Sequence, residues 1–340
     1  MNERNLEVLE QYDLEVRDVR RGRGAFLCET SQGLKLLKEY RGSVRRLEFE
    51  HEVLGFLKQE KSLELEQYQK TSEGNLVSIA PDGTKYILKD WFLDRECDLR
   101  SERDVRHAVR GLALLHKKMR EIEWKEEWNL GSITEKPLSD EMVRHNRELM
   151  RVRKFIRNKK KKSEFEFCVL KNFNVFFEQA QEAARGLQAV RWEKSMYLCH
   201  GDMNQHHILI RDGIHDGSSD SGGEAGLVFT EFNQMHQGVQ VEDLYRLVRK
   251  TLEKQGWRSD LGMELLEEYD AVLPLGRQDR EALYYLFLYP EKYWKQMNFY
   301  LNNNKAWIPM KNIEKLMKLE EQFQERDEFL QKIHEKIERF

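Results

Sequence analysis

The sequence predicts an α+β protein of two lobes, in which a small antiparallel sheet carrying one helix precedes a larger, mainly helical part. Two patterns support this prediction. In the first 93 residues, short apolar segments bounded by turn residues surround one stretch of helical spacing. After Asp98, apolar residues recur every three or four positions through much of the chain. The length of 340 residues is enough for two cores, because a domain commonly holds about 100–200 residues.

The small lobe is expected to consist of strands around a single helix. Residues 12–40 have the character of strands, and residues 43–58 switch to helical spacing. This helix carries one leucine stripe: Leu47, Leu54 and Leu57. Two further strands are expected at residues 76–79 and 86–88, joined by the turn Pro81-Asp82-Gly83. The order strand, strand, helix, strand, strand fits a small antiparallel sheet.

The larger lobe is expected to be mainly helical. Helices are predicted over residues 101–119, over a pair within 140–190, and throughout the C-terminal part. The last of them is predicted as a single helix with apolar residues at near-helical spacing: Leu316, Phe323, Leu330, Ile333 and Ile337. Strands at residues 208–210 and 227–229 enclose residues 211–226, whose Gly, Ser and Asp content is typical of a mobile hairpin tip.

Charge and cysteine content exclude several classes of protein. The 57 basic and 60 acidic residues leave a formal net charge of −3, so nucleic acid is not an expected partner. The four cysteines form no CxxC pair, which argues against a zinc knuckle or a disulfide scaffold. The N-terminal residues lack a secretion signal, and no apolar run approaches the roughly 20 residues that cross a bilayer. We therefore expect a soluble protein of cytoplasmic synthesis without a membrane span.

The strongest chemical signal is the run HGDMNQHHIL, which begins at His200 and contains Asp202 and His207. It follows a predicted strand at residues 196–199, and Glu231 comes after the next strands. Phosphoryl transfer needs a carboxylate that orients or deprotonates the acceptor hydroxyl, and ligands for Mg²⁺ on the phosphates. The pattern resembles the catalytic loop HGD-x-x-x-x-N of aminoglycoside and choline kinases. The resemblance implies a bilobal protein kinase-like fold of the aminoglycoside phosphotransferase type, with ATP and Mg²⁺ as cofactors.

Two positions depart from the resembled pattern. The resemblance places Asp202 at the carboxylate position, His207 where the family has Asn, and Glu231 where it has a metal-binding Asp. Mg²⁺ prefers oxygen ligands in octahedral geometry, which a Glu can supply from one methylene further out. An imidazole suits softer metals better than Mg²⁺. The sequence therefore leaves both an active kinase and a silenced kinase fold open, and Asp202 itself has a structural alternative.

Lys38 is the predicted phosphate-binding lysine. It follows the strand residues 34–37, where the resembled fold holds the nucleotide phosphates. On the following helix, Glu50 lies on the apolar stripe, and a carboxylate that faces a core is costly unless it is paired. We therefore expect an ion pair between Lys38 and Glu50 in the nucleotide site. The alternative is an exposed strand-end lysine and a half-exposed glutamate.

Two further residues are expected to support the predicted loop. His200 belongs to the motif and is expected to hold the loop backbone rather than to react. Glu242 and Asp243 open a helix, where acidic residues are favoured by the helix dipole and by capping. The resemblance implies in addition that Asp243 braces the catalytic loop.

A basic run extends from Arg151 to Lys162, with eight basic residues and no acid. Such a run is explained by a solvated helix end and loop, and we expect it to be largely exposed. A docking patch for an anionic partner is the alternative. After Phe155 no aromatic residue interleaves with the basic ones, which argues against nucleic acid.

Two stretches resemble the CotS-type spore coat family of endospore-forming bacteria. The first is the basic run Arg151–Lys162 with the string FEFCVL that begins at Phe165. The second is the string YPEKYWK from Tyr289, with NKAWIP after it, ending at Pro309. The resemblance extends from about residue 10 to residue 320. It implies a phosphotransferase-like fold and an association with the spore coat.

These observations predict the following organisation. Residues 1–93 form the nucleotide-binding lobe, 94–98 a hinge, and 99–340 the helical lobe. The helical lobe contains the catalytic loop 200–209 and the metal-position segment 229–233.

The first functional hypothesis is ATP-dependent phosphorylation of a hydroxyl group on a small molecule or sugar. Asp202 would position the acceptor, Lys38 the phosphates and Glu231 the metal. The second hypothesis is a catalytically impaired pseudokinase that serves as a structural or docking component of the spore coat, with coat proteins as partners. A third is a polyanion-binding module built on the run Arg151–Lys162.

Overall fold

The structure is a computed structural model, and it describes residues 3–22, 24–58, 63–131, 133, 138–191, 196–211, 226–303 and 308–338. The chain divides into two compact units, each of which is described by itself. The first unit comprises Met1–Thr134 and Tyr197–Gln237, and the second comprises Glu135–Met196 and Gly238–Phe340. The predicted catalytic loop therefore belongs to the same compact unit as the N-terminal sheet.

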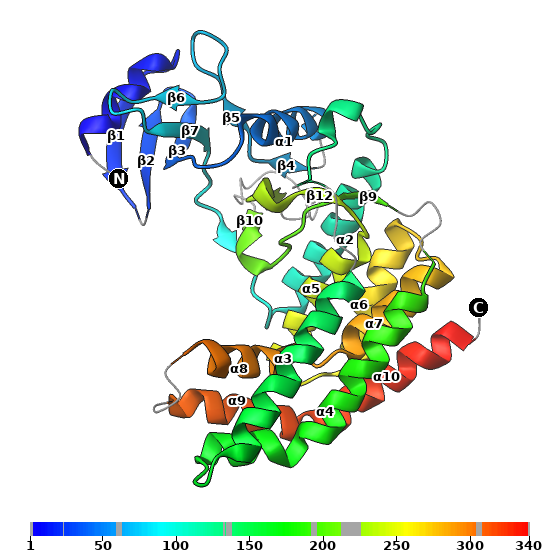
Figure 1. Cartoon of the computed structure of the whole chain (residues 1–340). Coiled ribbons are helices and arrows are strands. Elements are labelled where there is room, and N and C mark those ends of the chain that lie inside the picture. Colours follow the sequence, from blue (N-terminus) through cyan, green and yellow to red (C-terminus); the bar gives the residue numbers. More distant parts are fainter. Residues whose placement is uncertain are drawn as a thin grey trace. The chain divides into compact units, whose positions relative to one another are not determined.

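The first unit begins with a 3₁₀ helix, Glu3–Gln11, followed by an antiparallel sheet (Figure 1). Its strands are β1 (Val16–Arg21), β2 (Ala25–Thr30), β3 (Gly33–Glu39), β5 (Tyr68–Gln69), β6 (Ser78–Ile79) and β7 (Lys85–Asp90). They follow the order β1-β2-β3-β7-β5, and β6 pairs with the start of β7. Helix α1 (Val44–Leu57) follows β3, so the single helix lies between strands as expected, although three strands precede it where two were expected.

The two faces of this sheet have different tasks, because successive residues of a strand point to opposite faces. One face packs with the N-terminal 3₁₀ helix in a core of buried residues: Val8, Leu9, Tyr12, Phe26, Cys28, Leu37, Ala80, Tyr86 and Leu88. The register pairs Lys38 with Ile87, and Tyr68 with Lys89. Lys38, Tyr68 and Lys89 therefore share the other face, away from that core.

A second sheet completes the first unit. Its strands are β4 (Glu64–Leu65), β8 (Arg95–Glu96), β10 (Ile208–Arg211) and β11 (Gly226–Phe229), in the order β4-β11-β10-β8. Strands β10 and β11 form the expected antiparallel pair. Helix α2 (Glu102–Met119) begins at Ser101, whose hydroxyl accepts a hydrogen bond from the backbone of Asp104. Strand β9 (Tyr197–Cys199), which directly precedes the predicted loop, pairs with β12 (His236–Gly238).

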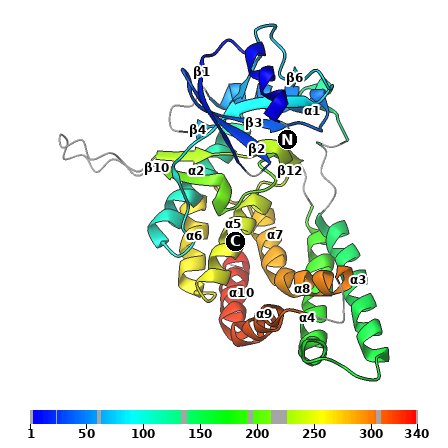
Figure 2. The same ribbon diagram turned by 90° about the vertical axis from the view of Figure 1, so that its left-hand side faces the viewer.

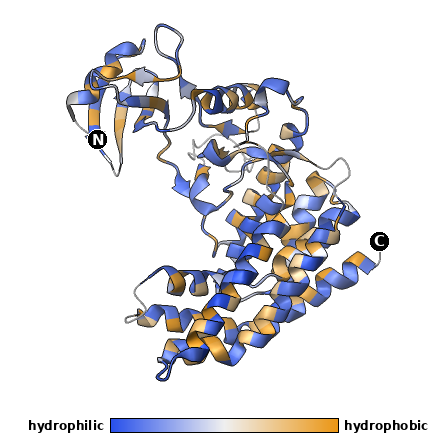
Figure 3. Cartoon of the chain, in the orientation of Figure 1, coloured by the Kyte–Doolittle hydropathy of each residue, from blue (hydrophilic) through white to orange (hydrophobic). Residues whose placement is uncertain are grey.

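The described part of the second unit is helical. Its helices are α3 (Leu138–Asn158), α4 (Glu164–Ala189), α5 (Val241–Lys254), α6 (Ser259–Val272), α7 (Arg277–Leu288), α8 (Glu291–Asn302), α9 (Met310–Glu321) and α10 (Phe323–Glu338). The predicted helical pair is confirmed, since α3 and α4 lie side by side. Helix α4 begins with a capping box, in which Ser163 and Glu166 each bond the other's backbone N–H. Figure 3 shows polar and apolar residues interleaved along these helices, as amphipathic packing requires.

Several sequence-based expectations need correction or lie outside the described residues. The final helix is two helices, α9 and α10, which meet at Gln322 and run in different directions (Figure 2). The two-residue strands β4, β5 and β8 were not expected, because they are too short to show a period. Residues 212–225 of the expected hairpin tip and residues 304–307 of the NKAWIP string lie outside the described residues. Within the described residues, no helix combines the length and apolar character that spanning a membrane requires.

The basic run Arg151–Lys162 is partly structural, although it was expected to be a solvated end and loop. Arg151, Lys154, Arg157, Lys160 and Lys161 are exposed. By contrast, Lys159 Nζ lies 2.5 Å from an oxygen of Glu166, whose side chain is fully buried. The hydroxyl of Tyr300 donates to the same carboxylate. Lys159 is therefore the partner of a buried charge, and the polyanion hypothesis keeps only the exposed members of the run.

Replacing lysines in this run should separate the two kinds of residue. We expect Lys159→Met to lower the free energy of unfolding by about 2 kcal/mol, because it removes a charged hydrogen bond from a buried carboxylate. The neighbouring exposed substitution Lys160→Met should change it by no more than about 0.5 kcal/mol. Urea denaturation of both variants checks this. Equal losses of unfolding free energy in the two variants would show that the ion pair between Lys159 and Glu166 does not stabilise the fold.

The contribution of Lys159 to the free energy of unfolding should also depend on pH. Burial would by itself raise the pKa of Glu166, but Lys159, Tyr300 and the Ser163 N–H hold it below its ordinary value of 4.5. A carboxylate with a lowered pKa stabilises the fold above its unfolded pKa, and this stability is lost as pH falls through the folded pKa. The difference in unfolding free energy between wild type and Lys159→Met should therefore be full above pH 4.5 and shrink below it. A difference that stays constant down to the acid transition would contradict this account.

Candidate functional site

The loop that begins at His200 is held by contacts to backbone atoms. His200 is fully buried, and its Nε2 lies 3.0 Å from the carbonyl oxygen of Thr230. Its Nδ1 lies 3.3 Å from the backbone N of Asp202, which can only donate. Both contacts are satisfied by one neutral tautomer with its proton on Nε2. The imidazole thus connects the start of the loop with the end of β11, a bracing rather than a reacting geometry.

Gly201 permits the close approach of two segments. Its φ is +84°, in the left-handed region that favours glycine. A Cβ at this position would lie 2.1 Å from the carbonyl oxygen of Gln234 and 2.8 Å from Nδ1 of His236. No side chain fits there without moving the backbone of residues 234–236. The glycine of the motif is therefore explained by its backbone conformation and by packing.

Asp202 presents its carboxylate to solvent, with 47% of its side chain exposed. Its Oδ2 lies 3.8 Å from Nδ1 of His207, and its backbone carbonyl oxygen lies 2.8 Å from the same nitrogen. Asn204 also donates its side-chain N–H to that carbonyl oxygen, at 2.8 Å. The side-chain N of Asn204 also lies 3.0 Å from Nδ1 of His207, so this ring nitrogen is engaged by contacts within its own loop. The side chain of Asp202 remains available to a ligand.

Glu231 stands at the centre of the site and is held by two lysines. Its Oε1 lies 2.6 Å from Nζ of Lys89, and its Oε2 lies 3.9 Å from Nζ of Lys38. Glu231 has a left-handed backbone, with φ of 63°. Oε1 of Glu66 accepts the backbone N–H groups of Glu231 and Phe232, at 2.8 and 3.2 Å, which fixes this conformation. The other oxygen of Glu66 lies 2.9 Å from Lys89 Nζ.

Burial and charge act in opposite directions on this cluster. Burial would by itself raise the pKa of Glu231, but the charges of Lys89 and Lys38, with that of His207, hold it below its ordinary value. Burial would likewise lower the pKa of Lys89, yet Glu66 and Glu231 raise it. Both shifts favour the ionised forms, so Lys89 and Glu231 form a charged pair at neutral pH.

The predicted pair of Lys38 with Glu50 is wrong. Glu50 binds Arg46, one turn earlier on α1, with 2.6 Å between Nε and Oε1, and its Oε2 accepts from the hydroxyl of Tyr68 at 2.8 Å. Arg46 in turn donates to the carbonyl oxygens of Asn233 and Met235. Glu50 therefore orients an arginine that holds the segment after Glu231, and it does not contact Lys38. Residues four apart on a helix are neighbours, so Arg46 pairs with the buried carboxylate of Glu50 in place of Lys38.

The residues at the predicted metal position do not fit a divalent ion. Each oxygen of Glu231 already faces an ammonium group, and the imidazole of His207 is a poor ligand for Mg²⁺. Among the described residues, no group of three or more His, Cys, Asp or Glu side chains is placed to hold a metal ion. Mg²⁺ needs oxygen ligands that are free to coordinate. We therefore assign no step to a metal ion.

The structure brings most of the predicted site residues together. Asp202, His200, His207, Lys38 and Glu231 all lie in the first unit, linked by the contacts above. Asp243 lies in the second unit, buried in the first turn of α5, and its bracing role stays a prediction.

Sequence reasoning missed three residues of the site: Arg46, Glu66 and Lys89. A signal existed for Lys89, because it directly follows the apolar strand residues 86–88. A lysine in such a place needs a charged partner.

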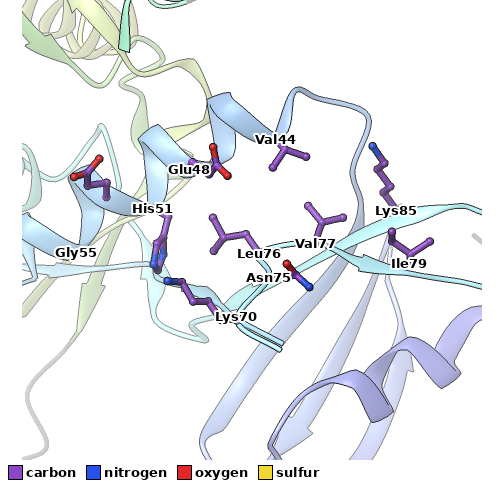
Figure 4. Close-up of a pocket in the computed structure, with 12 residues that line it drawn as sticks. Val44, Glu48, His51, Gly55, Lys70, Asn75, Leu76, Val77, Ile79 and Lys85 are labelled. Atoms are coloured by element: carbon purple, nitrogen blue, oxygen red, sulfur yellow. The ribbon is translucent and has the colours of Figure 1, made fainter. Parts of the chain in front are cut away.

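A separate cavity of about 720 Å³ lies between α1 and the strands β6 and β7 (Figure 4). Val44, Leu76, Val77 and Ile79 supply its apolar lining. His51, from the middle of α1, also lines it. The cavity contains none of the predicted site residues, so it is not the site that the motif indicates.

Comparison with known proteins supports the fold. No protein-family model matches the chain, and no curated protein matches its sequence. Among solved structures, an aminoglycoside phosphotransferase from Alicyclobacillus acidocaldarius is 15% identical with a TM-score of 0.80, covering 98% of this chain and 96% of that chain. A spectinomycin phosphotransferase bound to AMP is 11% identical, with a TM-score of 0.63 and coverage of 92% and 93%. An amicoumacin kinase in complex with AMP-PNP and Ca²⁺ is 13% identical, with a TM-score of 0.56 and coverage of 96% of both chains.

The chain has the aminoglycoside phosphotransferase fold. The predicted α+β class and kinase-like architecture are thereby confirmed. At these identities the similarity concerns the fold alone, and function has to be argued from the site.

Replacing Gly201 tests the close approach at the loop. Gly201→Ala should lower the free energy of unfolding by more than the left-handed penalty of about 1–2 kcal/mol, because its Cβ meets a backbone oxygen. Gly83→Ala is the matched control, since Gly83 has φ of +82° and open space around its Cβ position. Urea denaturation followed by tryptophan fluorescence measures both. Equal losses would show that the approach of Gln234 does not constrain the loop.

Proposed function

We propose that this protein binds a nucleotide and transfers a phosphoryl group to a hydroxyl group of a small molecule or sugar. The observation that carries the proposal is the pair of exposed functional groups in one compact unit. The side chains of Lys38 and Asp202 are 42% and 47% exposed, while His200, Glu66 and Lys89 of the same unit are buried. Lys38 would bind the phosphates of the nucleotide, and Asp202 would orient or deprotonate the acceptor hydroxyl.

The supporting contacts agree with this division of roles. His200 and Gly201 fix the loop backbone, so that Asp202 emerges from a rigid turn. Lys38 extends from β3 beside Glu231, on the sheet face that is free of the N-terminal core. Three structurally similar proteins, the spectinomycin phosphotransferase, the amicoumacin kinase and an aminopropanol kinase, are phosphotransferases or kinases by name, which supports the proposal by analogy of fold.

A second candidate function is a pseudokinase of the spore coat, which would bind nucleotide without transfer and dock to coat proteins. The contact between Lys89 and Glu231 favours it, because it occupies a residue that the resembled kinases use for metal. The CotS resemblance of the basic run and of the string YPEKYWK supports the coat association. Two aromatic residues of the string make hydrogen bonds within the second unit. The hydroxyl of Tyr293 donates to the carbonyl oxygen of Val169, and the indole N–H of Trp294 donates to the carboxylate of Glu148.

Substitution of Asp202 decides between the two functions. With ATP and a panel of polyols, amino alcohols and sugars, the wild type should release ADP in an acceptor-dependent reaction. Asp202→Asn should reduce this turnover by about 100-fold or more, the usual contribution of a general base, and should leave the Kd for ADP within about threefold. Coupled ADP release and calorimetry measure the two quantities.

His206→Gln is the matched control from the same loop, because the His206 side chain is exposed and contacts Glu96 and Gln205 at the surface. It should retain turnover. Nucleotide binding without ADP release in the wild type would replace the enzymatic proposal with the pseudokinase one. Absence of nucleotide binding would refute both.

A further inference from the structure

The position of Lys89 has a consequence for the charge of the site. Its ammonium lies between two carboxylates, at 2.9 Å from Glu66 and 2.6 Å from Glu231, and only 4% of its side chain is exposed. The Glu66 side chain is 2% exposed and that of Glu231 24%. Two converging carboxylates are a donor set that hard divalent cations use. In this chain the space between them is filled by a cation that belongs to the protein.

The surrounding contacts keep that cation in place. Glu66 uses one oxygen for two backbone N–H groups and the other for Lys89, so its carboxylate has no unengaged oxygen. Tyr68, opposite Lys89 in the sheet, donates its hydroxyl to Glu50 and not to this cluster. A divalent ion that bound Glu231 would have to displace the ammonium and leave it buried with Glu66 alone. Separating a buried pair in this way is strongly unfavourable.

We propose that Lys89 is a built-in cation that takes the place of a divalent metal ion between Glu66 and Glu231, so that phosphate binding at Lys38 does not require a divalent cation. The two carboxylates and the two lysines carry opposite and equal charge, so Glu231 does not repel an incoming phosphate. Lys38, the exposed lysine of the two, provides the contact to it. The part of the inference that concerns phosphate rests on the proposed nucleotide binding, whereas the exclusion of metal does not.

Removing the ammonium should convert the cluster into a metal site. Lys89→Met leaves two carboxylates facing a vacated position, and a cation that bridges them would stabilise the folded state. We expect the wild-type melting temperature to be unchanged by about 5 mM MnCl₂ at constant ionic strength, and that of Lys89→Met to be lower but to rise by several degrees with the same salt. Adding Glu231→Gln to Lys89→Met should abolish the rise.

The chain offers a matched control in the same sheet. Lys35 is also a buried lysine, 7% exposed, with its Nζ 2.6 Å from Asp90. It has a single carboxylate partner and does not contact Glu231. Lys35→Met should therefore be destabilised without any rescue by Mn²⁺. If Lys89→Met does not fold in either condition, it is replaced by Lys89→Gln, whose amide can donate a hydrogen bond to each carboxylate without supplying a charge. Because both carboxylates remain, this variant should still be stabilised by Mn²⁺.

Three results would overturn the proposal. The first is a rise of the wild-type melting temperature with Mn²⁺ that Glu231→Gln removes, because metal would then bind beside Lys89. The second is the absence of any Mn²⁺ response in folded variants that lack Lys89. The third is equal rescue of Lys35→Met, which would show a non-specific effect of the salt.

Calorimetry with ADP separates this inference from the proposed function. The Kd of the wild type for ADP should be the same in EDTA and in Mg²⁺ within about twofold. The Kd of Lys89→Met should be lower in Mg²⁺ than in EDTA by about tenfold or more. Binding by the wild type only in Mg²⁺ would overturn the inference and leave the proposed function standing. Absence of ADP binding in both conditions would refute the proposed function, while the Mn²⁺ experiment still decides the role of Lys89.

Discussion

The charged cluster of Lys89, Glu66 and Glu231 is the interaction on which the geometry of the site depends. It joins strand β7, the residue that follows strand β4 and the turn after β11, three segments that are separate in the sequence. Burying these charges is tolerated only because each has its partner, and the loss of one member would leave an uncompensated buried charge. The same cluster fixes the left-handed backbone of Glu231 through Glu66, and it determines which oxygens can meet a ligand. The same atoms thus determine both the stability of the fold and the contacts that a ligand can make. A substitution in this cluster therefore affects both.

The loop that presents Asp202 depends on backbone geometry. His200 connects it to Thr230, and the absence of a side chain at Gly201 lets Gln234 approach. Arg46 holds the same stretch from the other side, since it donates to the carbonyl oxygens of residues 233 and 235. These contacts position a carboxylate without specifying what it does. The geometry of the loop is thus explained by backbone contacts, whichever residues stand at the predicted metal positions, His207 and Glu231.

The elements that could be predicted from the sequence were those whose apolar residues recur with the period of a strand or a helix. Strands β1 to β3 and helices α1 to α4 repeat their apolar residues often enough to be recognised, and the HGD motif located the loop. A two-residue strand such as β4 is too short to show an alternation of apolar and polar residues. A charged residue beside such a segment is therefore expected to be solvent-exposed. Glu66 was missed for this reason, because its partners Lys89 and Glu231 are distant in sequence. The error at Glu50 has a different cause: burial correctly predicted that it needs a cation, but Arg46 and Lys38 were both available, and spacing alone does not rank them.

Lys38 and Lys89 lie on the sheet face away from the N-terminal core, and they differ in how deeply they are buried. Lys38 is half-exposed and can follow a phosphate, whereas Lys89 is enclosed and can only neutralise its carboxylates. A fixed ammonium supplies one positive charge where a divalent ion would supply two, and it cannot move with the phosphoryl group. Binding of a nucleotide needs charge neutralisation in the ground state, whereas transfer needs additional stabilisation of the charge that spreads over the transferred group. A site of this composition therefore satisfies the requirements of binding more fully than those of rapid transfer. The two candidate functions accordingly differ in turnover and share their nucleotide site.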